Sequence, residues 1–209
     1  MFLKRLTVGA LETNCYLIAC EKTQKAAVID PGGEEEIDLI LSLLQKDNLS
    51  LKYIINTHGH IDHIAGNNLL RTKTEALLLI HKLDADMLVD ANKNFSSFMG
   101  KKICSPPADK FLEEGVEIPL GRLKLTVIHT PGHTPGGISL VSNNIIFTGD
   151  TLFAGGIGRT DLPGGSYQDI IKSIKEKLLI LGDDKIIYPG HGPGSTIGKE
   201  RRTNPYLKN

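Results

Sequence analysis

The chain has 209 residues, of which 40% are hydrophobic, so it can bury one sizeable core or a core built from two related halves. Its 24 basic and 24 acidic residues give a formal net charge of zero, which argues against a nucleic-acid partner. No apolar run approaches the length of a membrane span, and Glu12 and Asn14 interrupt the amino-terminal segment before a secretory signal develops. We therefore expect a cytoplasmic protein with small-molecule partners, and we make no prediction of its oligomeric state.

The three cysteines are odd in number and lack the C-x-x-C spacing of a metal site, which fits a reducing cytoplasm. Small apolar core positions are the expected environment for such thiols. We predict that environment for Cys15, Cys20 and Cys104.

The hydrophobic pattern predicts strands interleaved with a few helices. A β-meander over 2–8, 14–20 and 25–30 precedes a helix that opens at 34–36, with apolar residues at helical spacing up to Leu44. A second clear helix begins near Ser166, whose hydroxyl can cap it with Asp169 at the third position, and ends at Gly182. The other expected elements are a helix after His63, a strand near 77–80, a helix over 82–90, and strands at 116–118, 123–129, 138–142 and 144–149.

The order of these elements indicates the fold class. Helices fall early and late in each half of the chain, while the β-segments cluster between them. Two sheets packed face to face with helices outside satisfy that order, so we predict an α/β protein with a four-layer αβ/βα sandwich. We expect one domain over residues 1–209, with an irregular excursion at 91–108 beside the active site.

The most specific signal is T-H-G-H-I-D-H at 57–63, directly after the apolar run 51–56. It places three imidazoles and a carboxylate within six residues, a pattern that composition alone would rarely produce. Three more apolar runs of the kind that forms buried strands end in a glycine and are followed at once by a metal-ligating side chain. Those side chains are His133, Asp150 and His191.

Strand ends in layered α/β folds meet at one sheet edge, where ligands gather. Five histidines and two aspartates exceed the needs of one tetrahedral ion, but they suit two adjacent ions with a shared carboxylate and a bridging water. Because two such ions make hydroxide available near neutral pH and polarise a carbonyl or phosphoryl oxygen, hydrolysis is the expected reaction class. Zinc is the expected metal, with iron and manganese as alternatives that accept the same ligands.

Taken together, these motifs resemble the metallo-β-lactamase superfamily, and their order and spacing span nearly the whole chain. The resemblance implies an αβ/βα sandwich with a dinuclear centre at the sheet edge. It also implies that Asp150 bridges the ions and that Asp62 has a catalytic role, orienting the hydroxide while binding metal. Carried over residue by residue, it assigns His58, His60 and His133 to the first metal and Asp62, His63 and His191 to the second.

Within that superfamily, residues 150–153 and 155–159 resemble the glyoxalase II branch, the hydroxyacylglutathione hydrolases, in a short single-domain form. That resemblance implies a thioester substrate, possibly derived from glutathione, and makes Arg159 the candidate substrate contact. A structural pair between Arg159 and Asp161 is the competing interpretation. The typical enzymes have a tyrosine in place of Asp161 and a further helical domain after the last metal histidine, whereas eighteen residues follow His191 here.

Several alternatives remain open. Asp30 either supports the ligands from behind, by orienting an imidazole, or is a turn residue before Pro31. A mononuclear iron persulfide dioxygenase would use His58, His133 and Asp150, and a metal-stabilised binding module without turnover is the alternative outside enzymes. A β-lactamase and a nuclease are less favoured by the sequence. His81 and His129 are expected to be structural.

Overall fold

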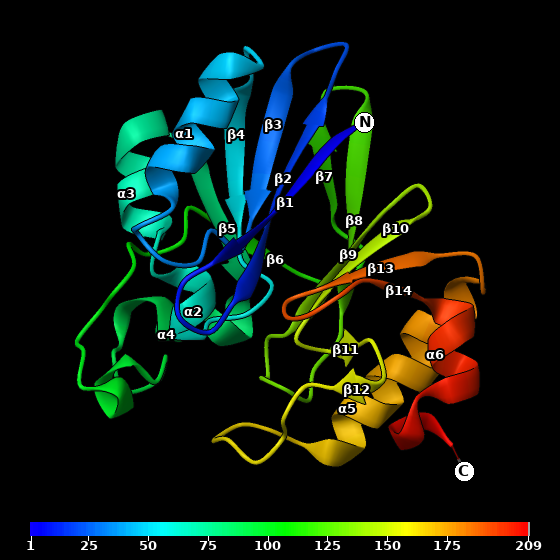
Figure 1. Cartoon of the computed structure of the whole chain (residues 1–209). Helices are drawn as coiled ribbons and strands as arrows, with labels where there is room; N and C mark the ends of the chain where they lie inside the picture. Colours follow the sequence, from blue (N-terminus) through cyan, green and yellow to red (C-terminus); the bar gives the residue numbers. More distant parts are fainter. Residues whose placement is uncertain (209) are drawn as a thin grey trace.

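The computed structural model describes residues 1–208 and shows two six-stranded sheets with helices on their outer faces (Figure 1). The first sheet has the order β1-β2-β3-β4-β5-β6 and the second the order β14-β13-β10-β9-β8-β7. The first comprises β1 (Phe2–Val8), β2 (Thr13–Cys20), β3 (Lys25–Ile29), β4 (Ser50–Ile55), β5 (Leu77–His81) and β6 (Lys110–Leu112). The second comprises β7 (Glu117–Leu120), β8 (Leu123–His129), β9 (Ile138–Ser142), β10 (Ile145–Gly149), β13 (Ile186–Pro189) and β14 (Ser195–Thr196).

Helices and a small hairpin complete the architecture. The hairpin joins β11 (Leu152–Phe153) to β12 (Gly156–Ile157). The α-helices are α1 (Ile37–Lys46), α2 (Ile61–Ile64), α3 (Asn67–Thr74), α4 (Ala85–Val89), α5 (Tyr167–Ser173) and α6 (Ile197–Thr203). Short 3-10 segments lie at Lys82–Asp84, Ser96–Met99, Leu179–Leu181 and Pro205–Leu207. Within residues 1–208, no helix is both long enough and apolar enough to cross a membrane.

Three apolar clusters separate the four layers, as the predicted αβ/βα sandwich requires. One packs α1 and α3 on the outer face of the first sheet, and includes Ile40 and Leu70. The second fills the space between the sheets, where Tyr16 of β2 meets Phe147 of β10 with ring centroids 5.1 Å apart. The third packs α5 and α6 on the outer face of the second sheet, and includes Ile170 and Ile197. The expected fold class is therefore confirmed.

Local sequence signals fix the helices with small departures from prediction. The Ser166 hydroxyl accepts a hydrogen bond from the Asp169 amide at 3.2 Å, so the predicted cap is present. The predicted helix continues as a wider π-helical turn over Ile174–Leu178 and a 3-10 turn before it stops at Gly182. The helix expected from residue 34 begins later, at Ile37. The helix expected after His63 is present as α3, and the short helix α2 precedes it at Ile61–Ile64.

The thiol prediction is correct for two cysteines and wrong for the third. Cys15 and Cys20 are buried in strand β2, whereas Cys104 is exposed. Cys104 lies on the irregular segment 91–108, which projects from the side of the molecule near α4 (Figure 1), so no layer of the sandwich covers it.

Parallel pairing brings the candidate ligands to one edge. Strand β3 pairs in parallel with β4 in the first sheet, and β10 pairs in parallel with β13 in the second. Parallel neighbours end on the same side, so the residues after their last positions meet there. Those residues are Asp30, the segment 57–63, Asp150 and His191.

Candidate metal centre

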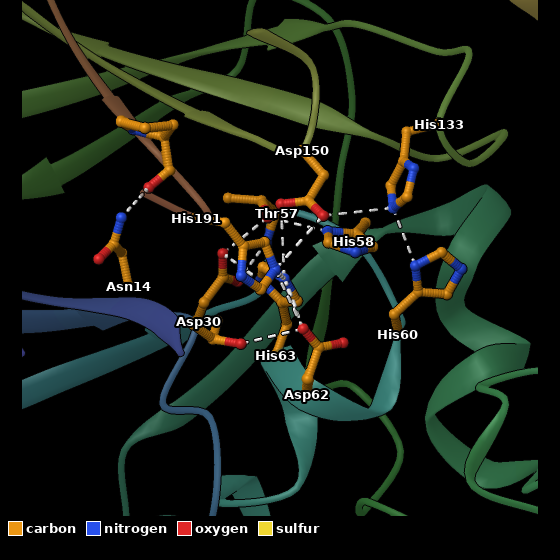
Figure 2. Close-up of polar contacts among 12 residues, drawn as sticks. Asn14, Asp30, Thr57, His58, His60, Asp62, His63, His133, Asp150 and His191 are labelled. Carbon is orange, nitrogen blue, oxygen red and sulfur yellow. Dashed lines mark hydrogen bonds and ion pairs between the residues drawn. The ribbon is translucent and has the colours of Figure 1, made fainter. Parts of the chain in front are cut away.

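All seven predicted ligands converge at this sheet edge (Figure 2). Three groups of side chains have donor atoms within 4.8 Å of one another. They are His58, His60 and His133; Asp62, His63 and His191; and His58, His63 and Asp150. The first two groups contain the same residues as the two metal sites that the family resemblance implies.

The first group consists of three buried imidazoles. His58 and His60 follow strand β4, and His133 follows β8. His133 Nε2 lies 2.9 Å from His60 Nδ1, and the His58 ring centroid is 4.8 Å from that of His133. Burial lowers the pKa of His58 well below its ordinary 6.5 and that of His60 to about 3. Both imidazoles are therefore neutral near pH 7 and can donate a nitrogen lone pair to a cation.

The second group combines a carboxylate with two imidazoles. Asp62 Oδ2 lies 3.3 Å from His63 Nε2 and 3.2 Å from His191 Nε2, and the two Nε2 atoms are 3.3 Å apart. Burial raises the pKa of Asp62, but His63 and the hydrogen bond from His191 more than offset this and hold it well below its ordinary value. Asp62 is therefore an ionised acceptor.

Asp150 lies between the two groups. Its Oδ2 atom is 3.5 Å from His133 Nε2 and 3.6 Å from His191 Nε2, and its Oδ1 atom is 3.5 Å from His63 Nε2. One carboxylate thus faces imidazoles of both groups, which is the position that a bridging ligand requires.

The donor atoms fit divalent cations. His58 Nε2 and Asp150 Oδ1 are buried and have no hydrogen-bond partner, which is costly unless a ligand satisfies them. The set contains only nitrogen and carboxylate oxygen donors, which suits zinc, iron or manganese.

Hydrogen bonds behind the imidazoles aim their inner nitrogens at the centre. The Nδ1 atom of His133 lies 2.7 Å from the Arg159 carbonyl oxygen, and that of His191 lies 3.0 Å from the Leu11 carbonyl oxygen. His58 Nδ1 is 3.2 Å from Thr57 Oγ1. Such partners fix the orientation of a ligating imidazole and leave its other nitrogen free for a metal.

Asp30 lies behind the metal-ligating side chains and contacts two residues of the 57–63 segment. It is buried, its Oδ2 atom lies 3.0 Å from His63 Nδ1, and it accepts hydrogen bonds from the Thr57 amide and hydroxyl. Its backbone φ of 51° lies in the left-handed region. The carboxylate therefore joins the end of β3 to two residues of the 57–63 segment.

Asp84 is a buried carboxylate that the sequence analysis did not single out. It accepts hydrogen bonds from the Gly59 amide at 3.2 Å, the Thr134 hydroxyl at 2.7 Å and the Gly136 amide at 2.6 Å. It thereby ties the loop of His58 and His60 to the loop of His133. The sequence places Asp84 inside an expected helix, and its three partners are distant along the chain, so no local signal identified it.

Strand β2 makes hydrogen bonds to the second ligand group and to the residues before His191. The Thr13 hydroxyl donates to Asp62 Oδ2 at 2.9 Å, and the Asn14 amide donates to the Gly190 carbonyl at 2.7 Å. The Asn14 side chain donates to the Pro189 carbonyl at 2.9 Å (Figure 2). Strand β2 thus connects the two sheets where their ligands meet.

Gly190 allows the bridging carboxylate its position. A Cβ atom at Gly190 would lie 2.1 Å from Asp150 Oδ1 and 2.9 Å from the His63 ring. Any side chain there would displace both groups, so glycine is required for this close approach.

Arg159 lies beside the centre but is already paired. Its Nε and Nη2 atoms donate to the two Asp161 carboxylate oxygens at 2.9 Å and 2.7 Å. Both side chains are mostly exposed, and Arg159 also lines a cavity of about 860 Å³ whose floor includes His60, Asp62 and Asp150. The ion pair between Arg159 and Asp161, which is the alternative to a substrate contact for Arg159, is therefore present.

His81 and His129 stand apart from the centre, as expected. Their rings stack with centroids 4.1 Å apart, and the His81 Nδ1 atom accepts a hydrogen bond from the Leu83 amide. Among the residues described, neither contributes to any of the three ligand groups.

Three similar proteins match this chain over nearly its whole length. The hydroxyacylglutathione hydrolase GloC of Haemophilus influenzae is 37% identical over 218 residues, which cover 99% of this chain and 98% of GloC. The crystal structure of BLEG-1 B3 metallo-β-lactamase superposes with a TM-score of 0.94 at 34% identity and covers 100% of both chains. A di-iron-bound form of TTHA1623 superposes with a TM-score of 0.85 at 35% identity, over 98% of this chain and 100% of that one.

The family model described as the metallo-β-lactamase superfamily matches residues 8–191, a range that includes every ligand of the three groups. This match agrees with the four-layer fold and with the relatives above. The chain belongs to the metallo-β-lactamase superfamily.

Proposed function

We propose that the protein is a metal-dependent hydrolase, and specifically a thioesterase of the hydroxyacylglutathione hydrolase type. The observation that carries the proposal is the pair of complete ligand groups joined by Asp150 at the floor of an 860 Å³ cavity. The similarity to GloC supports the thioester specificity.

Each ligand has a role in this proposal. His58, His60 and His133 would hold the first ion, Asp62, His63 and His191 would hold the second, and Asp150 would contribute a carboxylate oxygen to each. Two bound divalent ions would polarise a carbonyl oxygen and make hydroxide available near neutral pH. Zinc is the metal we expect, although the relative TTHA1623 is described in a di-iron-bound form, so iron is a direct alternative.

The chain itself orients the reactants. Asp62 is ionised and accepts a hydrogen bond at Oδ2 from the Thr13 hydroxyl, which leaves Oδ1 to accept a hydrogen bond from the attacking water and orient it. The leaving group of a thioester is a thiolate, which has a pKa of about 8.5 and needs little proton assistance. The absence of a buried general acid from this proposed mechanism is therefore no obstacle.

One other activity has specific support, and a second is disfavoured by the ligand set. The similarity to BLEG-1 favours β-lactam hydrolysis by the same ligands. A mononuclear iron persulfide dioxygenase would use His58, His133 and Asp150 alone, and would leave the ligand group of Asp62, His63 and His191 without a function. The completeness of that group favours the dinuclear hydrolase.

The test compares three substrates on one metal-loaded preparation. Lactoylglutathione should be hydrolysed with release of a free thiol, and Asp62→Ala should abolish this activity. Oxygen consumption with glutathione persulfide, without thioester turnover, would replace the proposal by the dioxygenase. Cleavage of a β-lactam alone would replace it by a lactamase, and no turnover of any substrate would favour a binding module.

A further inference from the structure

The cavity above the ligands has an apolar wall. Beyond the metal-ligating side chains, it is lined chiefly by Phe95, Phe98, Met99, Phe153, Ile157 and Leu162. Phe98 is 79% exposed and Met99 50% exposed, so these large apolar side chains stand in water at the cavity rim. Exposed apolar surface gathered at a concave site marks a place where a ligand removes it from water.

One side of the wall is fixed to the metal-ligand segment. The Asn94 carbonyl accepts a hydrogen bond from the Ile61 amide at 3.0 Å, and the Asn94 side chain donates to the Ile103 carbonyl at 3.0 Å. Asn94 is fully buried, and the Phe95 ring lies 5.1 Å from the His60 ring. The segment that carries Phe95, Phe98 and Met99 is therefore a built part of the cavity, although it contains little regular structure.

Apart from the two ions proposed at its floor, the cavity offers few cationic groups to an anionic substrate. Among its described lining residues, Arg159 is the one lysine or arginine, and Asp161 occupies both arms of its guanidinium fork. Glutathione carries two carboxylates and one ammonium group, so it needs cationic partners that this wall does not supply. An uncharged apolar group can instead bury surface against the phenylalanines without losing strong hydration.

We propose that the cavity selects thioesters that carry an uncharged, apolar group on the acyl or the thiol side, with Phe98 and Met99 as specificity-determining residues. This inference rests on the thioesterase function proposed above. The same apolar chemistry can come from either side of the thioester, and the substrates below distinguish the two.

The first experiment uses thioesters of three thiols with acetyl, butanoyl and hexanoyl groups. N-acetylcysteamine supplies an uncharged thiol, N-benzoylcysteamine an uncharged thiol with a larger apolar group, and glutathione a charged thiol. Full burial of one methylene group changes kcat/KM about fourfold, and half-burial changes it about twofold. If the acyl group binds the apolar wall, kcat/KM should therefore rise roughly tenfold or more from the acetyl to the hexanoyl thioester. If the thiol group binds the apolar wall instead, kcat/KM for N-benzoylcysteamine thioesters should exceed that for glutathione thioesters of the same acyl group by a similar factor.

Variants test the residues. Phe98→Ala and Met99→Ala should remove most of that gain, whereas Phe111→Ala should retain it, because Phe111 is also an exposed phenylalanine but lies on β6 away from the cavity lining. Asp161→Ala should lower KM for lactoylglutathione only, because it releases Arg159. The proposal would be overturned if kcat/KM depended on neither the acyl group nor the thiol group. It would also be overturned if Phe98→Ala and Met99→Ala kept the substrate preference of the wild type.

A binding measurement separates this inference from the proposed function. The S-methyl and S-octyl thioethers of N-acetylcysteamine cannot be hydrolysed, so titration calorimetry reports the cavity alone. At least tenfold tighter binding of the S-octyl compound, lost in Phe98→Ala and kept in Phe111→Ala, would support the apolar site even if no thioester were cleaved. Equal affinities would refute it even in an active thioesterase.

Discussion

At the scale of single residues, Asp150 makes the most specific prediction. Its two oxygens face imidazoles of both ligand groups at 3.5–3.6 Å. Asp150→Ala should therefore lower metal content at both sites and abolish hydrolysis, because loss of one shared carboxylate weakens both ions. His81→Ala is the control, since its ring stacks on His129 outside the centre, and its metal content should match wild type. Equal metal content and activity in wild type and Asp150→Ala would show that the centre lies elsewhere.

His63 makes a prediction about pH. Burial lowers the pKa of its imidazole, but Asp62, Asp30 and Asp150 more than offset this and raise it well above the ordinary 6.5. In the metal-free protein His63 is therefore protonated at pH 7, and a cation must displace that proton. Metal binding should release a proton, and affinity at this site should fall by up to about tenfold per pH unit below that pKa. Calorimetry in buffers of different ionisation enthalpy measures the released proton.

The same shift has a consequence for stability. Because the folded-state pKa is raised, the stabilisation from His63 in metal-free protein is complete below about pH 6.5 and is lost as pH rises through the folded value. Thermal unfolding midpoints of metal-free wild type should therefore fall above neutral pH more steeply than those of His63→Gln. Parallel curves, or no proton release, would mean that His63 is neutral before metal binds.

At the scale of elements, the loop after β8 depends on close packing against α5. Gly132 has a φ of +136°, and a Cβ atom there would lie 2.2 Å from the Ile170 amide nitrogen. Gly132→Ala should destabilise the protein by roughly 3–5 kcal/mol and displace His133. Gly100→Ala is the control, with a positive φ of +71° in the left-handed helical region and open space around it, and should cost about 1 kcal/mol. Urea unfolding of both variants measures the difference, and equal losses would refute the packing argument.

The elements were predictable where the sequence carries a periodic signal. The cap of α5 and strand β9 follow from local chemistry, and β9 has the expected bounds of 138–142. Strands β6 and β14 were not predicted, because β6 has three residues and β14 two, which is too short for a pattern. The wall formed by Phe95 and Phe98 was not predictable either, since it depends on the tertiary bonds of Asn94.

At the scale of the whole molecule, the ligands were predictable because the fold repeatedly places a metal-ligating side chain after the end of an apolar strand. Apolar strands that end at one edge carry His133, Asp150 and His191, and the contiguous motif at 57–63 supplies the rest. The support behind the ligands was harder to predict. From the sequence alone, Asp30 is equally well interpreted as a turn residue. Asp84 acts through hydrogen-bond partners that are distant along the chain and meet only in the folded sandwich.

The number of ions per chain tests the central claim most directly. Elemental analysis of metal-saturated protein should give two ions for wild type, because both ligand groups are complete and share Asp150. His63→Ala should retain the ion held by His58, His60 and His133 and lose the other. A single ion in wild type that is unaffected by His63→Ala would contradict the dinuclear centre and favour the mononuclear iron alternative.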